Sequence, residues 1–401
     1  MSEVVSIPQL RFPEFSGEWR VDKFVDLCKF QQGVQVDVEL QSTEPKNNFL
    51  RFLRIENYTQ KSNDFRYIPK ELSSNKSITE NEIAIVRYGA TAGYIGRGLK
   101  GVLANNLFKL VLNKDTLDTD YLFHLLRSYK TFCFFQSEMS GGAMPALSFG
   151  IVGALKLPYS SISEQQKIAA FLTAVDNKIE QLSKKQELLG EYKKGLMQQI
   201  FSQAIRFKAD DGCDFPDWEE KSLGELFNYK NGGSFENEVV KDGLYNLITL
   251  NSITIDGELK NEHKKINSFD NSLKINDLIM VLSDVAHGNF LGLTAIIPED
   301  NSYVLNQRMG ALKSKGLNNV VFLRLLINYN QKYFKLHGQG SSQQNLSKGD
   351  ILKFELLLPN RNEQQKIANF LSSIDTKIEQ VGKQLDESKQ FKKALLQQMF
   401  V

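Results

Sequence analysis

The sequence predicts an α+β protein in which two mixed α/β globular segments are joined by two long antiparallel helices that form an intramolecular coiled coil. Three observations predict this fold. They are an internal repeat, two long proline-free segments with heptad spacing of apolar residues, and strand-like and helix-like stretches in the rest of the chain. At 401 residues the chain is longer than one domain usually is. The repeat implies a pseudo-two-fold relation between the two halves.

The internal repeat is the most specific feature of the chain. Residues 164–201 and 363–400 align at a constant offset of 199 without a gap, and 20 of the 38 positions are identical. The starts of the two halves also match, since FPEFSGEW at residues 12–19 resembles FPDWEE at residues 215–220. The chain is therefore a duplication whose globular segments have diverged further than its long segments.

The first globular segment, residues 1–160, is predicted to be mixed α and β. Residues 83–88 and 107–112 are rich in β-branched and aromatic residues and are bounded by Gly, Asn or Asp, which favours strands. Residues 119–135 are predicted to form a helix. A loop rich in Gly and Ser follows at residues 140–142.

Residues 161–201 are predicted to form the first long helix. Apolar residues recur there at steps of three and four, as in a coiled-coil seam, although Gln186 and Lys193 interrupt the seam. Ser161 and Ser163 are candidate N-caps, because a short side-chain acceptor can bind a free backbone N–H. At ~1.5 Å per residue the repeated 38 residues span roughly 57 Å. The seam consists of Ile168, Leu172, Val175, Ile179 and Leu182.

The second globular segment, residues 202–362, follows the order of the first. Residues 277–282 and 293–297 are predicted to be strands, and residues 319–334 a helix. A polar loop at residues 338–345 then precedes an apolar run that ends in Pro359.

Residues 363–401 are predicted to form the second long helix, with Asn362 as the candidate N-cap. The first helix carries the chain to the second globular segment, so packing of the matching seams requires the second helix to run back antiparallel. A coiled coil between two copies of the chain is the alternative. The second seam is interrupted by Ser388 and Lys392, and it consists of Ile367, Leu371, Ile374, Ile378 and Val381.

Composition and charge exclude several classes of protein. The chain has 49 basic and 47 acidic residues, so any nucleic-acid surface must gather its positive charge into patches. The three cysteines lie far apart, which argues against a disulfide framework or a cysteine-based zinc site and fits a reducing cytoplasm. No apolar run of 18 residues and no signal-peptide pattern is present, so we expect a cytoplasmic protein without a membrane span.

The search for catalytic motifs is negative. The chain contains no Gly-x4-Gly-Lys-Ser/Thr loop for ATP and no Asn-Pro-Pro-aromatic tetrad of the kind that an amino-methyltransferase uses. Its four histidines are scattered, and a lone histidine is more often structural than catalytic. We therefore predict no catalytic, cofactor-binding or metal-binding residue in this chain.

Polar residues in the two globular segments point to DNA binding. Arginine can pair with guanine, and asparagine or glutamine with adenine, whereas lysine and serine are expected mostly on phosphates. For each residue taken singly, a solvated surface side chain is the alternative. In the first segment the candidates are Lys61, Arg66, Arg87, Tyr88, Thr91 and Arg97. In the second they are His263, Lys264, Lys265, Ser283, His287, Asn289, Gln307, Arg308, Gln339, Ser341, Ser342, Gln343, Gln344 and Asn345.

The repeated EQQKIAxFL…DxKIEQ…KKxLxQQxF, the FPxFxGEW opening and the GAT…G segment after residues 83–88 resemble the specificity subunit of a type I restriction–modification system over essentially the whole chain. The resemblance implies that residues 1–160 and 202–362 are target recognition domains. It also implies that residues 161–201 and 363–401 are the central and C-terminal conserved spacer helices. Each target recognition domain would then read one half of a split double-stranded DNA site.

The resemblance also implies partners. Two methyltransferase subunits would dock on the spacer helices, bind S-adenosylmethionine and methylate adenine N6, and two restriction subunits would use ATP and Mg²⁺. The helices would set the gap between two half-sites about one helical turn, ~34 Å, apart, and phosphate contacts would make the affinity fall with salt. A stand-alone DNA-modifying enzyme, either a methylase or a nuclease, and a protein-only coiled-coil scaffold are the alternatives.

Overall fold

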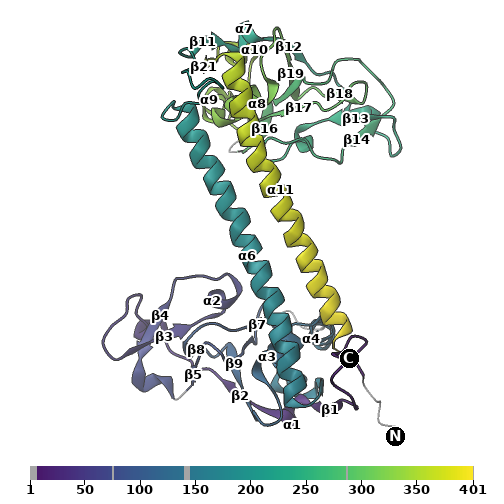
Figure 1. Cartoon of the computed structure of the whole chain (residues 1–401). Coiled ribbons are helices and arrows are strands. Elements are labelled where there is room, and N and C mark those ends of the chain that lie inside the picture. The colour runs from purple at the N-terminus through teal and green to yellow at the C-terminus, as the bar shows by residue number, and fades with distance from the viewer. Residues whose placement is uncertain (1–6, 75, 140–144, 286–287, 401) are drawn as a thin grey trace. The chain divides into compact units, whose positions relative to one another are not determined.

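The computed structural model describes residues 7–74, 76–139, 145–285 and 288–400. The chain forms two compact units of mixed α and β structure (Figure 1). Unit 1 comprises residues 1–185 and 381–401, and unit 2 comprises residues 186–380. The boundary divides both long helices, so each unit contains one globular segment together with a part of each long helix.

The two long helices are α6 (Ile162–Phe201) and α11 (Arg361–Gln398), drawn in teal and yellow in Figure 1. α6 begins where Ser161 Oγ accepts a hydrogen bond from the backbone N–H of Glu164 (3.4 Å). The prediction that Asn362 caps the second helix was wrong. Asn360 Oδ1 accepts the bond from the backbone N–H of Glu363 (3.0 Å), so α11 begins two residues earlier than expected.

Unit 1 is built on an antiparallel four-stranded sheet. Its strands in spatial order are β2 (Cys28–Gln32), β9 (Leu107–Leu112), β6 (Ala84–Val86) and β7 (Ile95–Gly96). The strand predicted at residues 107–112 is confirmed, and the one predicted at residues 83–88 is shorter than expected. Phe24, Phe108 and Leu122 lie in the core on this sheet, and none of the three is exposed.

Two further groups of strands complete unit 1. In the second four-stranded sheet β3 (Phe49–Leu53) runs parallel to β8 (Gly101–Leu103), and the other neighbours are antiparallel. Its strands in order are β4 (Arg66–Pro69), β3 (Phe49–Leu53), β8 (Gly101–Leu103) and β5 (Ser77–Ile78). A separate antiparallel pair joins β1 (Arg20–Lys23) to β10 (Lys156–Tyr159), which brings the start of the segment beside its end.

Unit 2 repeats this plan. Its four-stranded antiparallel sheet has the order β12 (Phe227–Asn231), β19 (Met309–Ser314), β15 (Leu278–Val281) and β17 (Thr294–Ile296). Its three-stranded sheet has the order β14 (Lys264–Ile266), β13 (Tyr245–Ile248) and β18 (Tyr303–Leu305). Two antiparallel pairs join β11 (Glu219–Ser222) to β21 (Glu355–Leu358) and β16 (Ser283–Val285) to β20 (Gln343–Asn345). The strands predicted in this segment are confirmed with slightly shorter bounds.

Each single helix predicted inside a globular segment is in fact two helices. Residues 119–135 contain α3 (Thr119–Leu126) and the start of α4 (Tyr129–Glu138), and the break lies where Ser128 Oγ accepts from the backbone N–H of Thr131 (3.3 Å). Residues 319–334 contain α8 (Val320–Tyr329) and most of α9 (Gln331–His337). The apolar pattern continues across both breaks, so it could not reveal them.

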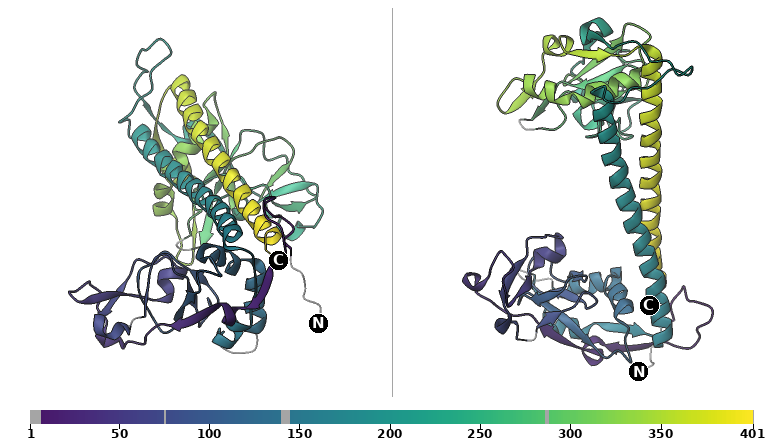
Figure 2. Two further views of the ribbon diagram at one scale, coloured as in Figure 1. Left: turned by 60° about the horizontal axis from the view of Figure 1, so that its bottom comes forward. Right: turned by 60° about the vertical axis from the view of Figure 1, so that its left-hand side comes forward.

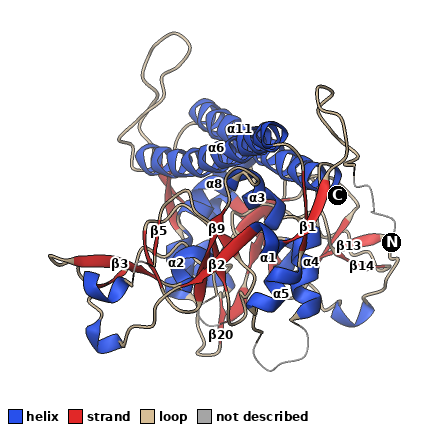
Figure 3. Ribbon diagram, turned by 90° about the horizontal axis from the view of Figure 1, so that it is seen from below, coloured by secondary structure: helices blue, strands red, loops and turns tan. Residues whose placement is uncertain are grey.

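The remaining helices are short. α1 (Phe24–Leu27) and α5 (Phe149–Ala154) pack against one another in unit 1, near β2 and β9 (Figure 3). These helices are α1 (Phe24–Leu27), α2 (Ile55–Thr59), α5 (Phe149–Ala154), α7 (Leu223–Leu226) and α10 (Lys348–Leu352). Turns of 3₁₀ helix lie at Val38–Leu40, Lys70–Ser73, Glu236–Glu238 and Leu250–Ser252.

The long helices contribute to the core of each unit. In unit 1, Ile168 and Leu172 of α6 belong to the same buried cluster as Leu395 and Met399 of α11, and Figure 2 shows these helix ends beside the first globular segment. In unit 2 the cluster joins the end of α6, at Ile200, to the first turns of α11. The predicted seam residues are all buried or half-buried, and in the first turns they face the globular segments as well as the other helix.

The lysines that interrupt the predicted seams take part in ion pairs. Lys193 Nζ lies 2.6 Å from Asp375 Oδ1 in unit 2, and Lys392 Nζ pairs with Asp176 in unit 1. Both pairs are related by the offset of 199. Partial burial lowers the pKa of Lys392, and the hydrogen bond to Asp176 opposes this effect. These two lysines are therefore positions where the two helices bind one another through charge.

A buried carboxylate at the start of α6 joins the helix to the N-terminal FPEFSGEW segment. Arg11 donates from Nε and Nη2 to the two carboxylate oxygens of Glu164 (2.7 and 2.8 Å), and Trp19 Nε1 donates to Oε1 (3.3 Å). Glu164 is 1% exposed. Two motifs that lie 145 residues or more apart are thus parts of one contact.

Unit 2 contains the same contact. Arg206 donates from Nε and Nη2 to Glu363 (2.9 Å each), and Trp218 Nε1 donates to Glu363 Oε2 (3.2 Å). The following glutamine of each repeat is also buried. Gln165 Oε1 accepts from the backbone N–H of Asp118 (2.8 Å), as Gln364 Oε1 does from that of Asn319 (2.9 Å). The repeated EQ dipeptide therefore fastens each long helix to its globular segment.

Candidate nucleic-acid interface

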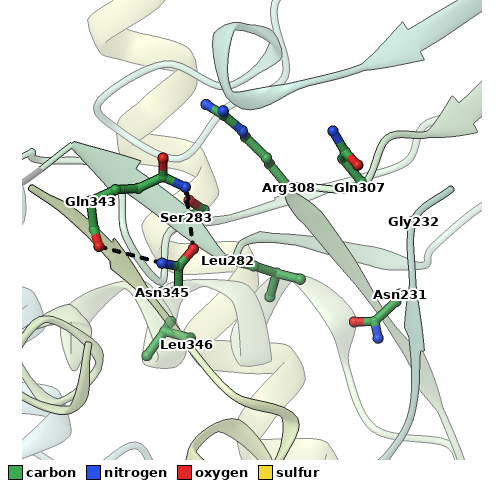
Figure 4. A pocket seen from close by; sticks show the side chains of 9 residues that line it. All are labelled: Asn231, Gly232, Leu282, Ser283, Gln307, Arg308, Gln343, Asn345 and Leu346. Carbon is green, nitrogen blue, oxygen red and sulfur yellow. Dashed lines mark hydrogen bonds between the residues drawn. The ribbon is translucent and has the colours of Figure 1, made fainter. Parts of the chain in front are cut away.

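A polar pocket of about 440 Å³ lies in unit 2 (Figure 4). It is formed where the end of β12, the β16–β20 pair and the turn between β18 and β19 meet. Five of its lining residues were predicted as DNA-binding candidates from the sequence. The lining residues are Asn231, Gly232, Leu282, Ser283, Gln307, Arg308, Gln343, Asn345 and Leu346.

A glycine allows the strand β12 to approach the β18–β19 turn. A Cβ on Gly232 would lie 2.0 Å from the carbonyl oxygen of Asn306, a distance that no side chain tolerates. The backbone N–H of Gly232 donates to Met309 O (3.0 Å), and that of Gly233 to Leu305 O (2.9 Å). This close approach places Asn231 at the same opening as the turn residues.

The β16–β20 pair forms the opposite wall of the pocket. Its register places Ser283 opposite Asn345. Gln343 Nε2 donates to Ser283 Oγ, and Asn345 Nδ2 donates to the backbone carbonyl of Gln343 (3.3 Å), as Figure 4 shows. These bonds fix the orientation of three polar side chains before any ligand arrives, which lowers the entropic cost of binding.

Gln307 and Arg308 occupy the turn between β18 and β19, and both side chains are exposed. Within residues 7–74, 76–139, 145–285 and 288–400, neither side chain makes a hydrogen bond or an ion pair. The guanidinium of Arg308 therefore has all of its donors available. An arginine and a glutamine side by side carry the donor and acceptor groups that recognise purine edges in the major groove.

The rest of the predicted polar loop follows the pocket wall. Gln339 and Asn345 exchange two backbone hydrogen bonds (3.0 and 2.9 Å), so the loop folds into a narrow hairpin. Ser341 and Ser342 lie at its exposed tip, and Gln344 lies on β20 opposite Asp284. Asn289 Oδ1 accepts from Lys335 Nζ (3.3 Å) and does not line the pocket. His287 lies outside the described residues.

Lys264 and Lys265 lie on β14 in the other sheet of unit 2, His263 directly precedes this strand, and none of the three lines the pocket. The ring of His263 packs edge-on against Tyr303, with 5.6 Å between the ring centroids. Burial lowers the pKa of His263, which keeps the imidazole neutral near pH 7. His263 is thus a packed residue, whereas the lysines are available for phosphate contacts.

In unit 1 the predicted candidates do not gather at one place. Arg87, Tyr88 and Thr91 follow β6 closely, whereas Lys61 and Arg66 belong to the β3–β4 region. The Arg87 guanidinium lies over the ring of Tyr88, 4.9 Å from its centroid. These residues therefore form two separate groups on the surface of unit 1.

Arg97 and Arg66 have protein partners already. Arg97 pairs with Asp120, and its guanidinium lies 4.0 Å from the centroid of the Phe123 ring. Arg66 lies 3.9 Å from Asp64. An arginine held in this way is less free to bind a base than Arg308.

The sequence analysis missed Asn231, which lines the pocket. The internal repeat is the signal that could have found it. The offset of 199 aligns the ends of the two corresponding strands, where it also relates Gly33 to Gly232. Among the residues that the structure describes, no group of three or more His, Cys, Asp or Glu side chains could hold a metal ion. Nor does any described helix have the length and apolar character needed to cross a membrane.

The chain resembles known proteins in sequence. The sequence model of the type I restriction modification DNA specificity domain matches it twice, at residues 17–189 and 216–387. The type I restriction enzyme MjaVIII specificity subunit of Methanocaldococcus jannaschii is 27% identical over 412 residues, which cover 96% of this chain and 92% of that protein. The MjaIX specificity subunit of the same organism is 29% identical over 154 residues, covering 36% of this chain and 35% of the relative.

Two solved structures share the fold. The S subunit of a type I restriction–modification system from M. genitalium has a TM-score of 0.63 at 18% identity, with 99% of both chains covered. A chain from a study of complex assembly and conformational transition of the type I R-M system has a TM-score of 0.59 at 16% identity, covering 95% of this chain and 97% of the other. At this level of identity the likeness concerns the fold.

Proposed function

This chain belongs to the family of type I restriction–modification DNA specificity subunits, and we propose that it is the non-catalytic subunit that reads a split DNA site for its partners. The observation that carries the proposal is the pocket of unit 2, in which Arg308 and Gln307 have no hydrogen-bond or ion-pair partner among the described residues and lie beside a wall of oriented amides. Side-chain donors and acceptors without protein partners can form hydrogen bonds with the edges of DNA bases, and this role requires no covalent chemistry.

Each globular segment reads one half of the site. The support is that the four-stranded main sheets of the two units have corresponding strand orders, whereas the polar residues around them differ. A duplicated fold with unlike side chains can bind two unlike base sequences. Because lysines and arginines on both units also meet phosphates, affinity for DNA falls with rising salt.

The two long helices pair antiparallel as an intramolecular coiled coil and set the gap between the half-sites. The start of α6 shares a core with the end of α11 in unit 1, and the reverse holds in unit 2. The pairs Asp176–Lys392 and Lys193–Asp375 link the helices in the two units. A helix rises ~1.5 Å per residue, so the number of residues in each helix determines the gap.

The same helices dock two methyltransferase subunits. Tyr192 of α6 and Phe391 of α11 are related by the offset of 199, and they are 55% and 52% exposed. Exposed aromatic side chains on a charged helix are typical anchors of protein interfaces. The partners bind S-adenosylmethionine and methylate adenine N6, and restriction subunits that join the complex use ATP and Mg²⁺.

The experiment that tests this function is methylation mapping in cells. The chain is expressed with the methyltransferase subunit of its own system, and N6-methyladenine is located by long-read sequencing. We expect methylation at one motif with two base runs and an unread gap, and none when either subunit is absent. Methylation by this chain alone would favour the stand-alone enzyme. Assembly of the complex without any affinity for DNA would favour the protein scaffold.

A further inference from the structure

Gly33 of unit 1 occupies the position that Gly232 has beside the pocket of unit 2. The backbone N–H of Gly33 donates to Leu107 O (2.9 Å), as that of Gly232 does to Met309 O (3.0 Å). A Cβ at either glycine would lie 2.2 Å or 2.0 Å from a carbonyl oxygen of the neighbouring turn. The same close backbone approach that shapes the pocket in unit 2 is therefore present in unit 1.

The opposite wall is also duplicated. The backbone N–H of Leu147 donates to Arg87 O, and that of Leu346 donates to Leu282 O, both at 2.8 Å. The residues next to these bonds also pair in corresponding positions, Tyr88 with Ala146 and Ser283 with Asn345. This correspondence aligns the residues that line the pocket, other than Gln343, with described residues of unit 1.

The alignment shows that the arginine occupies a different position in each unit, on the donor side of a backbone hydrogen bond in unit 1 and on the acceptor side of the equivalent bond in unit 2. In unit 1 the N–H of Arg87 donates to Asn106 O (2.8 Å), and in unit 2 the N–H of Leu282 donates to Arg308 O (3.0 Å). Arg308 corresponds to Asn106, and Leu282 corresponds to Arg87. Each unit thus has one arginine at this place, on opposite partners of the same bond.

The amides of the pocket have counterparts as well. Gln32 corresponds to Asn231, and Asn105 corresponds to Gln307. Gln32 Nε2 donates to the backbone carbonyl of Asn105 (2.8 Å), and Asn105 Nδ2 donates to Gln35 Oε1 (3.0 Å). The amides of unit 1 are therefore held in place by their own contacts, like those of the β16–β20 wall.

Hydrogen-bonding capacity in unit 1 remains unused. Arg87 Nε and Asn106 Oδ1 are buried, and neither has a partner among the described residues. The Arg87 guanidinium lies over two rings, 4.9 Å from the centroid of Tyr88 and 4.6 Å from that of Phe149. It makes no ion pair with any residue that the structure describes. The arginine is oriented by its neighbours but not neutralised by a carboxylate.

We infer that unit 1 contains a second base-reading site, in which Arg87 binds a guanine of one half-site as Arg308 binds a guanine of the other. The inference rests on the proposed function. A guanidinium pairs with guanine O6 and N7 through two parallel hydrogen bonds, and no other base offers two acceptors there. We call this the unit 1 reading site, and it consists of Gln32, Arg87, Tyr88, Asn105 and Asn106.

The position of the arginine gives each half-site its own arrangement. Because Arg87 and Arg308 extend from opposite partners of equivalent bonds, the guanine need not occupy the same place in the two base runs. The amide of Asn106 or Gln307 then lies beside the arginine and is available for a neighbouring base pair.

The test uses the full chain in complex with its methyltransferase subunits. Arg87→Gln and Arg308→Gln are mapped separately by long-read detection of N6-methyladenine on a randomised DNA library. We expect Arg87→Gln to reduce the preference for guanine by roughly tenfold or more at one position of one half-site. Arg308→Gln is expected to do the same in the other half only.

Controls separate base reading from other roles. Arg20→Gln, an exposed arginine on β1 of the same unit, should leave the motif unchanged. Arg87→Lys keeps the charge but loses the paired donors, so it should also relax the guanine position, even if Arg87→Gln assembles poorly. A uniform fall in methylation with the motif intact would overturn the inference, because it would mean a phosphate contact. A wild-type complex without a split motif would instead contradict the proposed function.

Discussion

Glu164 and Glu363 are the charged side chains most deeply buried at the ends of the long helices, at 1% and 0% exposure. Each accepts two bonds from an arginine and one from a tryptophan of the segment that opens its globular half. At the residue scale these carboxylates explain why the opening motif and the helix motif occur together in both halves. A buried charge is tolerated here because all of its neighbours donate to it.

Replacing Glu164 by glutamine should destabilise unit 1. The change leaves the Arg11 guanidinium without its counter-ion in a largely enclosed place, and we expect a loss of about 2–4 kcal/mol in the free energy of unfolding. Urea denaturation followed by circular dichroism measures it. Glu14→Gln removes an exposed carboxylate that pairs with Lys167 and should change stability little. Equal losses in the two variants would contradict the role given to Glu164.

His124 should make stability depend on pH. It is fully buried, its Nε2 lies 3.1 Å from Thr173 Oγ1, and burial lowers its pKa to about 4. The charged groups Asp176, Lys392, Arg97 and Arg127 around it change this value less than burial does. The unfolded histidine titrates near pH 6.5, so the folded state binds fewer protons between pH 6.5 and pH 4.

The stability that neutral His124 contributes is therefore fully present above about pH 6.5 and is lost as the pH falls toward 4. We expect the wild type to lose about 2–3 kcal/mol across this window relative to His124→Gln, in which no such proton is taken up. Urea titrations at several pH values compare the two proteins. Parallel curves for wild type and variant would show that another group is responsible.

At the element scale the long helices serve two purposes with one apolar face. Their first turns pack on the globular segments, whereas farther along the helices Leu182 and Val381 are buried and the lysine–aspartate pairs link one helix to the other. Lys193 and Lys392 weaken the heptad pattern in the sequence, but each one pairs with an aspartate of the other helix. A polar residue within an apolar seam can select one pairing register over others.

Tyr192 and Phe391 are predicted to anchor the methyltransferase subunits. Changing both to alanine removes two exposed rings and should leave the thermal unfolding temperature nearly unchanged, because neither ring is buried in the free chain. We expect at least a tenfold weaker assembly with the methyltransferase subunit in size-exclusion or calorimetric titrations. Phe132→Ala on α4, whose ring is 56% exposed, is the matched control. Normal assembly of the double variant would place the interface elsewhere.

At the scale of the whole molecule, the duplication separates what is shared from what differs. The four-stranded main sheet, the close backbone approach at a glycine and the buried Glu-Gln contacts at the start of each long helix occur in both units. The side chains at the pocket and at the unit 1 reading site differ. A fold of this kind allows one half-site to change while the other is kept.

Exchanging residues 202–360 for those of a relative should change one half of the DNA target only. The exchange leaves α6, α11 and the first globular segment intact, so the gap and the other half should stay as they are. Methylation mapping before and after the exchange gives the result. A change in both halves, or in the gap, would contradict independent reading by the two segments.

The sequence by itself determined the duplication, the bounds of the long helices to within three residues, four strands of the two main sheets (β6, β9, β15 and β17) and the family. These features depend on local periodicity and on the repeat, which a linear chain displays directly. Five pocket residues were also identified by residue type, namely Ser283, Gln307, Arg308, Gln343 and Asn345. The breaks between α3 and α4 and between α8 and α9 were missed because the apolar pattern runs through them.

Only the tertiary structure decided which polar residues act together. Asn231, Ser283, Arg308 and Asn345 are far apart in the chain, and strand pairing alone brings them to one pocket. It also separated Arg97, which is held by Asp120, from Arg87, which has no carboxylate partner among the described residues. Residue type limits what a side chain can bind, but its availability depends on neighbours that the fold supplies.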